Sequence, residues 1–372
     1  MVARIVSIVF VVLVALGGVV AWQALRFVRT PAGGDDTLIV FNVKNGQTLR
    51  DIAMQLEEEK LITDARKFRA YVRVKSLGSK VRTGEYALKR NMSPAEILKI
   101  LSSGRSIEYV VTISEGLNRF EIASIVDRLG IGTRAEFLRL TQDREFIQQT
   151  LGDDIPTLEG YLFPETYYVT RASGVRGLVR QMVAKFNESF AQVPASMKSD
   201  IAVLLKKHQI VTLASIVEKE TGSAEERPLI SSVFHNRMRK GMKLQTDPTV
   251  IYGIWVRGGV WNRNISRQDL ITPSPYNTYI IPSLPPGPIA NPGLPALQAA
   301  VRPAKSEFLF FVSRNDGTHV FSRDYGQHKS AVNDYQLNKK AREGKSWRDL
   351  SKKNTSAGTP KSAAPPKPAV GK

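Results

Sequence analysis

The feature that most constrains this chain is an almost unbroken apolar run near its start, from Ile5 to Leu25. Its length is close to the roughly 20 residues that an α-helix needs to cross the hydrocarbon core of a bilayer. Trp22 stands where an interfacial aromatic side chain belongs. A cleaved signal peptide is the alternative, but the run is long for one and no small-x-small cleavage pattern follows it. We therefore predict a single transmembrane helix over residues 5–25.

The flanking charges of this helix do not settle its orientation, because Arg4 on one side faces Arg26 and Arg29 on the other. The stub of residues 1–4 is too short to carry a function, so the functional part of the chain lies on the C-terminal side of the helix. We expect the stub itself to be cytoplasmic. The bulk of the chain is then expected on the periplasmic or extracytoplasmic side of the inner (plasma) membrane, where a signal-anchor would place it.

The remaining chain has the composition of a folded globular protein. Apolar residues make up 42% of the 372 residues, enough for two or three domains with a sizeable core. The net charge of +19 suggests an anionic partner such as nucleic acid, a membrane surface or an acidic polymer, although a uniformly basic proteome would give the same excess. The basic residues are spread along the chain and no nucleic-acid-binding motif occurs, so we expect no nucleic-acid partner.

Cysteine is absent from the chain, which contains only four histidines. The absence of cysteine excludes thiol catalysis, cysteine-based metal sites and a lipidated-cysteine anchor. Without an HExxH motif, His319 and His328 are only weak metal-ligand candidates. We therefore expect neither a metal nor another cofactor.

After a polar linker at residues 26–37, three similar units each combine a short strand with a turn and an amphipathic helix. Each helix begins with a capping box, in which the N-cap side chain and an acid three residues later satisfy each other's backbone N–H groups. A further helix, Asp64–Leu77, is predicted between the first two units. The capping pairs are Thr48 with Asp51, Ser93 with Glu96, and Asn118 with Glu121.

The strand–helix–helix–strand order over residues 38–88 resembles a LysM module, and the turn Val43-x-x-Gly-x-Thr48 carries the likeness. LysM modules bind glycans that contain N-acetylglucosamine. The resemblance implies a small LysM-like α+β domain over residues 38–105. A small α+β spacer domain without a ligand is the alternative.

A candidate catalytic helix precedes Gly222. At about 100° per residue, Ile216 and Val217 share a face with Glu220, whereas Glu218 points well away from that face. Apolar neighbours, the negative helix end and a second carboxylate nearby would each favour the protonated form of Glu220. A carboxylic acid that stays neutral near pH 7 is the proton donor that glycoside cleavage needs. The alternative is a solvated helix end with Gly222 as an ordinary stop signal.

Three later loops are dense in Pro, Gly, Asn, Thr and Tyr, a composition that suits sugar recognition because rings stack on pyranose faces and amides bind hydroxyls. Ordinary turn chemistry is the alternative. The loops are Leu244–Gly253, Pro275–Tyr279 and Leu284–Gly293.

Amphipathic periodicity predicts three more helices, and a turn signal predicts a hairpin over residues 308–322 around Asn315–Gly317. The basic segment 346–372, rich in Pro, Ala and Lys, is expected to be a disordered tail. The predicted helices are Val175–Phe190, Met197–Lys207 and Ser223–Lys240, the last opened by a capping box of Ser223 and Glu226.

A series of short motifs along this chain occurs together in one family. They are Glu115-Gly116, Glu159-Gly-Tyr-Leu-Phe-Pro-Glu-Thr-Tyr167, Ala214-Ser-Ile-Val-Glu-Lys-Glu-Thr221, Glu226-Arg227, Val233-Phe-x-Asn-Arg237, Gly241-Met-x-Leu-Gln-Thr-Asp-Pro-Thr-Val250, Tyr252-Gly253, Tyr276-Asn-Thr-Tyr279, Leu284-Pro-Pro-Gly-Pro-Ile289 and Pro292-Gly293. Together they resemble the membrane-anchored endolytic murein transglycosylases of the MltG (YceG-like) type. The likeness runs from the apolar run to about Lys340.

The resemblance implies an α+β fold with one N-terminal transmembrane helix, the LysM-like domain, and a larger mixed α/β catalytic domain at residues 106–345 that holds a lysozyme-like catalytic helix. It implies a periplasm-facing enzyme that cuts nascent peptidoglycan glycan strands within their length, leaves 1,6-anhydromuramyl ends and so terminates the strands. In this family the catalytic acid is the Glu that precedes Thr, which is Glu220 here. Peptidoglycan glycan strands and the membrane are the implied partners, and peptidoglycan synthases are candidates.

Motif membership and residue type indicate a set of substrate-contact candidates around Glu220. The substrate-contact candidates are Thr221, Gln245, Asp247, Tyr252, Tyr276, Asn277 and Tyr279.

Asp247 permits an alternative reaction, because a second carboxylate across the sugar from Glu220 would make a hydrolytic muramidase possible. Its position before Pro248 favours a loop-fixing or substrate-orienting role instead. A third hypothesis is a non-catalytic, membrane-tethered glycan-binding scaffold.

Overall fold

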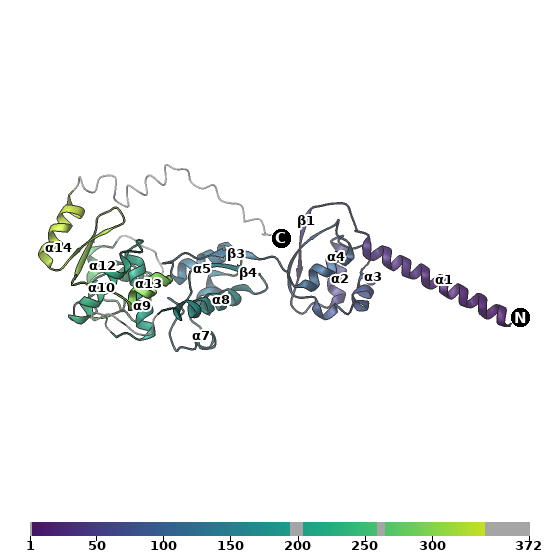
Figure 1. The fold of residues 1–372 in the computed structure, drawn as a ribbon, viewed down its shortest axis with the longest axis horizontal. Coiled ribbons are helices and arrows are strands. Elements are labelled where there is room, and N and C mark those ends of the chain that lie inside the picture. The colour runs from purple at the N-terminus through teal and green to yellow at the C-terminus, as the bar shows by residue number, and fades with distance from the viewer. Residues whose placement is uncertain (1, 194–203, 259–264, 339–372) are drawn as a thin grey trace. The chain divides into compact units, whose positions relative to one another are not determined.

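The fold mixes helices with three two-stranded sheets in the computed structural model, which describes residues 2–193, 204–258 and 265–338 (Figure 1). Contacts divide the described chain into two units. Unit 1 holds the residues up to Tyr109 together with the segment Tyr168–Gly174, which the sequence gives no reason to place there. Unit 2 holds Val110–Tyr167 and the described residues from Val175 onward.

The N-terminal apolar run forms one long helix, α1 (Val2–Arg29). Within its segment Ser7–Arg29 a stretch of 18 residues has a mean hydropathy of 2.5, and the segment is long and apolar enough to span a membrane. The helix continues beyond Leu25, so the first part of the predicted linker is helical. The reason is Phe27, which is only 9% exposed and belongs to the hydrophobic core of unit 1.

Unit 1 packs a pair of strands against helices. Strands β1 (Leu38–Val43) and β2 (Gly84–Lys89) pair antiparallel, with Phe41 opposite Tyr86. Both of these aromatic side chains are fully buried, as is Phe68 on α3 (Ala65–Val74). The other elements are α2 (Leu49–Glu58), a 3-10 turn (Gly78–Lys80) and α4 (Pro94–Ser103).

The three predicted capping boxes are confirmed. Thr48 and Ser93 cap α2 and α4, and Asn118 caps α5 (Arg119–Arg128), each with the predicted acid bonded back to the cap. Asp64 caps α3 by accepting hydrogen bonds from the Arg66 and Lys67 N–H groups at 2.9 Å. Local signals within a few residues therefore fixed these helix starts, as such signals do when both partners lie in one turn.

Unit 2 is mainly helical. Strand β3 (Tyr109–Thr112) pairs with β4 (Thr166–Val169), and each of these strands has residues in both units. Unit 2 also contains the predicted hairpin, which is confirmed as β5 (Phe310–Ser313) paired with β6 (His319–Ser322). The helices are α6 (Arg134–Leu140), α7 (Arg144–Leu151), α8 (Gly174–Phe190), α9 (Lys207–Glu220), α10 (Arg227–Arg239), α11 (Asp247–Gly258), α12 (Arg267–Ile271), α13 (Leu294–Val301) and α14 (Tyr325–Val332), with a π-helical turn at Asn333–Leu337.

Helix α9 lies inside the core of unit 2. Every residue from Val211 to Val217 is at most 1% exposed, and the helix packs against α10, α11 and α13. The two polar residues in this stretch, Thr212 and Ser215, donate their hydroxyl groups to helical carbonyls at 2.7 Å. The prediction of a helix with a single buried face is therefore wrong for Val211–Val217, which is covered on all sides.

The turn after α9 also differs from the prediction. The helix ends at Glu220, and Thr221 is extended with φ −143° and ψ 141°, so Gly222 is not a left-handed helix stop. Ser223 forms no capping box with Glu226, since its N–H is bonded to the Thr221 hydroxyl at 3.0 Å and α10 begins only at Arg227. The predicted helix Met197–Lys207 lies mostly outside the described residues, and the described part before Lys207 is not helical.

The loop predicted at Leu244–Gly253 is only partly a loop. From Asp247 the chain is helical and forms α11, with Pro248 in the first turn, where a missing N–H costs nothing. The chain just before it is tightly turned, because Gln245 has a positive φ of 50° and its N–H donates to the Thr278 carbonyl at 3.1 Å. This turn brings the residues before α11 against the segment around Thr278.

Gly160 allows a loop to pack directly on α9. It has φ +85°, and a Cβ atom at this position would lie 2.5 Å from Pro288 Cγ and 2.8 Å from Val211 Cγ1. Both neighbours are buried, so neither can move aside at low cost. Gly152 has a similar φ of +81° but no atom within 4 Å of the same position.

We expect Gly160→Ala to destabilise the protein by about 2–5 kcal/mol, because left-handed backbone strain and overpacking add together. Gly152→Ala is the matched control and should cost only the strain, about 1–2 kcal/mol. Urea unfolding of the two variants, followed by circular dichroism, measures the difference. Equal losses would show that the packing of this loop on α9 is not tight.

Candidate active site

Glu220 is the last residue of α9, and its carboxyl group is bound by a neighbouring hydroxyl. The Thr246 hydroxyl donates a hydrogen bond to Glu220 Oε1. Thr246 is itself only 2% exposed, and its N–H donates to the Thr278 hydroxyl at 3.0 Å. The orientation of the Glu220 carboxyl is therefore set by a residue 26 positions later in the chain.

The surroundings of Glu220 favour its protonated form. Burial raises the pKa of the Glu220 carboxyl to about 7, and the negative charge of Asp247 adds to this rise. The Thr246 hydrogen bond and the Arg237 guanidinium both lower the pKa and so oppose the rise. Near neutral pH the group is thus present both as an acid and as a carboxylate. Such a group can donate a proton in one step and accept one in the next.

Arg237 is a buried cation close to this carboxyl. It is 7% exposed, and its Nε and Nη1 atoms donate to the carbonyls of Leu309 and Leu244, both at 2.7 Å. Its guanidinium also lies over the Phe310 ring, 5.2 Å from the ring centre. These contacts fix the segment that leads to Thr246. Arg237 and Thr246 both lie in the quoted motifs, but no pattern in the sequence marked either of them as a site residue.

Asp247 and Tyr279 form a pair on the exposed side of the site. The Tyr279 hydroxyl donates to Asp247 Oδ1 at 2.6 Å. Burial, the bond to Asp247 and the Asp247 and Glu220 charges raise the pKa of Tyr279, so it stays a neutral donor. Asp247 is exposed, and Gln245 is an exposed neighbour whose side-chain oxygen lies 3.5 Å from Arg237 Nη1. Asp247, Gln245 and Tyr279 thus lie together near Glu220.

The other four substrate-contact candidates are placed differently. Tyr252 is 3% exposed and its hydroxyl donates to Glu159 at 2.9 Å, while Tyr276 is partly exposed with its ring edge-on to Tyr252. Asn277 is 1% exposed, and its amide donates to the backbone carbonyls of the segment 269–272. Thr221 is 5% exposed and donates to Glu226 at 3.3 Å. The polar groups of Tyr252, Asn277 and Thr221 are therefore used inside the protein.

The turn after Glu220 is tied to the hairpin near the end of the described chain. Glu226, the N-cap of α10, accepts the Thr221 hydroxyl at 3.3 Å. Its two oxygens also accept the backbone N–H of His319 at 2.8 Å and face His319 Nδ1 at 2.7 Å. A side chain from β6 thus fixes the backbone that follows the candidate acid.

A second buried glutamate, Glu159, was not among the site residues predicted from the sequence. It is 1% exposed and accepts hydrogen bonds from Tyr252, from the Asn291 amide and from the N–H of Arg119 at the start of α5. Burial raises its pKa to about 7, against the nearby Arg119 charge and these hydrogen bonds. The available signal was a glutamate inside an aromatic run. Its partners join three distant segments, so Glu159 is placed as a structural link.

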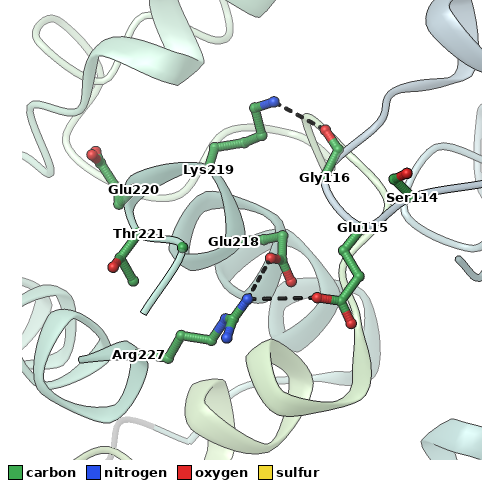
Figure 2. Close-up of a pocket in the computed structure, with 9 residues that line it drawn as sticks. Ser114, Glu115, Gly116, Glu218, Lys219, Glu220, Thr221 and Arg227 are labelled. Carbon is green, nitrogen blue, oxygen red and sulfur yellow. Dashed lines mark hydrogen bonds and ion pairs between the residues drawn. The ribbon is translucent and has the colours of Figure 1, made fainter. Parts of the chain in front are cut away.

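Glu218 belongs to a different cluster from Glu220. Its side chain is only 5% exposed and is bonded to the Arg227 guanidinium at 2.9 Å and to the Gly293 N–H at 3.1 Å. Glu115 lies 3.5 Å from the same guanidinium, and burial and the Glu218 charge raise the pKa of Glu115. Figure 2 shows the Glu220 carboxyl directed away from this group. Glu218 thus points away from Glu220, as the helical wheel predicts, but it is buried against Arg227. The carboxylate whose charge raises the pKa of Glu220 is Asp247 and not Glu218.

An open pocket of about 510 Å³ lies beside the end of α9 (Figure 2). Lys219 crosses its edge and donates to the Gly116 carbonyl at 3.0 Å. Within residues 2–193, 204–258 and 265–338, no group of three or more His, Cys, Asp or Glu side chains could hold a metal ion. The pocket is lined by Ser114, Glu115, Gly116, Glu218, Lys219, Glu220, Thr221, Gly222 and Arg227.

A carboxyl group with a pKa near 7, held by a hydroxyl at the end of a core helix and bordered by a pocket, defines a general acid–base site. The chain belongs to the YceG-like family, which it matches over residues 41–334. The family resemblance seen in the motifs is thus confirmed.

Similar proteins of the same kind are known from several bacteria. A Bacillus subtilis protein named endolytic murein transglycosylase is 31% identical over 314 residues, which cover 80% of this chain and 85% of that protein. A Streptococcus pneumoniae protein of the same name is 29% identical over 337 residues, covering 82% of this chain and 60% of that protein. A crystal structure of a YceG-like protein from Listeria monocytogenes is 30% identical, with a TM-score of 0.51 over 79% of this chain and 99% of that one.

The raised pKa of Glu220 predicts that the difference in stability between wild type and Glu220→Gln depends on pH. The unfolded carboxyl ionises near the ordinary value of 4.5 and the folded one near 7, so folding takes up a proton between these values and this group makes the protein less stable as pH rises. Glu220→Gln has no such ionisation. We expect it to be more stable than wild type at about pH 8.5, by on the order of 1–3 kcal/mol, and to lose this gain toward about pH 4.5.

Urea unfolding of wild type and variant across this pH range measures the effect. Glu159 titrates in the same window, but it is present in both proteins and cancels in the difference. Glu225→Gln, at an exposed position in the turn that follows, is the control and should change stability little at any pH. A stability gain for Glu220→Gln that does not vary with pH would contradict the raised pKa.

Proposed function

We propose that this chain is an endolytic murein transglycosylase that cuts nascent peptidoglycan strands between N-acetylmuramic acid and N-acetylglucosamine, leaves 1,6-anhydromuramyl ends and terminates strand elongation. The single observation that carries the proposal is Glu220, a carboxyl group with a pKa near 7 at the end of a core helix in a member of the YceG-like family. The relatives named endolytic murein transglycosylase support the reaction class.

One carboxyl group can serve both steps of this reaction. Protonated Glu220 gives its proton to the oxygen that links the two sugars, and the bond breaks as positive charge develops at the muramyl anomeric carbon. The muramyl C6 hydroxyl then attacks that carbon, and the Glu220 carboxylate takes the hydroxyl proton. No water is consumed. Because the nucleophile belongs to the substrate, its effective concentration is high.

The residues around Glu220 are proposed to divide into two groups. Thr246 and Arg237 position the acid and tune its pKa, while Gln245, Asp247, Tyr276 and Tyr279 offer polar or aromatic groups to the sugar chain. The remaining candidates, Thr221, Tyr252 and Asn277, hold the loops in place through their internal hydrogen bonds.

A hydrolytic muramidase is the second candidate function, and it would require Asp247 as the second carboxylate. Asp247 is exposed and close enough to raise the pKa of Glu220 by its charge. In a hydrolase it would activate water or bind the anomeric carbon. One Asp247 oxygen already accepts the Tyr279 hydroxyl at 2.6 Å, which supports a role in orienting substrate instead.

We propose roles for helix α1 and for residues 38–105 as well. Helix α1 would be a single-pass anchor in the inner membrane, with the bulk of the chain on the periplasmic or extracytoplasmic side. The strand–helix–helix–strand module of residues 38–105 would act as a LysM-like glycan-binding domain. Peptidoglycan synthases, which make the nascent strand, are proposed as partners because the substrate must reach the site as it is formed.

We expect Glu220→Gln to lower strand cutting by at least about 10²–10⁴-fold, because the proton donor is lost while the shape is kept. Glu218→Gln is the matched control two residues away. It should keep activity within about tenfold and lose on the order of 1–3 kcal/mol of stability, since its partner Arg227 retains Glu115. Incubation with purified glycan strands, followed by chromatography of the products, tests both. A Glu220→Gln variant that keeps full activity would remove Glu220 from the mechanism, whereas a wild type that cuts nothing would favour the scaffold hypothesis.

Asp247→Asn separates the two reactions. For a transglycosylase we expect anhydromuramyl ends to persist, with activity lowered about tenfold or less and its pH profile moved to lower pH, since loss of the Asp247 charge lowers the pKa of Glu220. Mass analysis of the strand ends reports the reaction directly. Reducing muramic ends in wild type, one water heavier, together with loss of activity in Asp247→Asn, would identify a muramidase.

A further inference from the structure

The apolar helix α1 and unit 1 are joined without a flexible segment. Phe27 in the last turn of α1 is buried in the core of unit 1, and Val28 packs against the same core. The helix contacts both α3 and α4. The chain beyond it is tied down as well, because the Gly33 N–H donates to the Arg90 carbonyl at 3.0 Å. Unit 1 therefore follows the position of the end of α1.

Helix α3, one of the two helices that α1 contacts, has a strongly basic outer face. Its apolar residues Phe68 and Val72 are fully buried. Arg66 and Lys67 before Phe68, and Arg73 and Lys75 after Val72, are exposed and cationic. Between Asp64 and Glu85 the chain contains no other acidic residue, and its cations are Arg66, Lys67, Arg69, Arg73, Lys75, Lys80 and Arg82.

Few of these cations are neutralised within the protein. Lys67 lies 3.6 Å from the capping carboxylate of Asp64, with both side chains partly exposed. In the described part of unit 1, no salt bridge reaches Arg66, Arg73 or Lys75. The outer face of α3 therefore keeps most of its positive charge for a partner.

An apolar side chain stands among these cations. Val74, the last residue of α3, is 81% exposed and lies between Arg73 and Lys75. An exposed apolar group flanked by cations is the pattern of a segment at a membrane interface, where the apolar group enters the headgroup layer and the cations meet phosphates.

Distance also favours the membrane as the partner. Trp22 and Arg26, whose guanidinium lies 5.5 Å from the Trp22 ring centre, mark the interfacial level of α1. Arg29 is seven residues beyond Trp22, which is about 10 Å along a helix. Packed helices lie about 8–10 Å apart, and the Debye length is about 8 Å at physiological salt. Cations on α3 are thus within reach of charged headgroups.

We propose that the outer face of α3, with Val74, binds the anionic phospholipid headgroups of the leaflet on its own side of the membrane. The proposal rests on the proposed role of α1 as an anchor. Its consequence is that unit 1 is held against the bilayer by two contacts, the span and this face, because anionic headgroups attract juxtamembrane cations.

The absence of cysteine from the chain makes a direct test possible. Val74→Cys carries a fluorescent label on α3, and Met54→Cys, on α2 and 53% exposed, carries the same label as a matched control. The full chain is reconstituted into phosphatidylglycerol or phosphatidylcholine vesicles that contain a quencher attached to a lipid headgroup. Flotation of the vesicles separately reports whether α1 inserts.

In phosphatidylglycerol vesicles we expect quenching at position 74 to exceed that at position 54 by about threefold or more, and to fall to the control level in phosphatidylcholine or in about 1 M salt. Neutralising the face with Arg66→Gln, Lys67→Gln, Arg73→Gln and Lys75→Gln together should have the same effect. Circular dichroism checks that this variant is folded, and all four positions are exposed.

The possible contrary results are distinguishable. A chain that floats with the vesicles but is quenched equally at positions 74 and 54 overturns the contact while leaving the anchor in place. Strong quenching at position 74 that is the same in both lipids, or survives the four substitutions, shows proximity without recognition of anionic headgroups and also overturns the proposal. A chain that floats with neither vesicle overturns the anchor and this inference together, without bearing on the reaction at Glu220.

Discussion

A hydrogen bond from the Thr246 hydroxyl to the Glu220 carboxyl joins the end of α9 to the residue before α11, and the chemistry at this helix end depends on it. Burial alone would keep a carboxyl group protonated and unable to give up its proton, because the charged form is costly without partners. The hydroxyl and the Arg237 guanidinium recover part of that cost, and Asp247 opposes them. The balance puts the pKa near 7, and each contributor is itself held by buried backbone contacts.

Two glutamates of one helix end illustrate how environment assigns roles. Glu218 and Glu220 are separated by one residue, yet Glu218 is paired with a buried arginine and Glu220 is not. The arginine pair belongs to a network that joins α9 to Glu115 and to Gly293. Structural and chemical roles are thus divided between neighbouring residues of the same type, and a substitution at either one disturbs only one of the two roles.

Sequence patterns predicted the features that depend on neighbours in the chain. The capping boxes at Thr48, Ser93 and Asn118, the hairpin at Asn315–Gly317 and the apolar helix α1 each need only one local signal. The full burial of α9 could not be predicted, because it depends on α10, α11 and α13.

The candidate site shows the same division between local and distant causes. Glu220 was found from a short pattern and a family likeness, but its partners Thr246 and Arg237 are distant in sequence. Glu159 was missed for that reason too, since its partners lie 40 to 132 residues away. The burial of Glu218 was not predicted, because a helical wheel shows direction around one helix and nothing of the arginine that pairs with it.

The link between Glu226 and His319 has a consequence for the order in which the protein matures. The backbone after Glu220 is fixed by a residue nearly a hundred positions later, and Arg237 is fixed by the Leu309 carbonyl just before β5. A ribosome releases these segments only when most of the chain has been made. The surroundings of Glu220 are therefore completed only when the hairpin of β5 and β6 closes on them, late in folding.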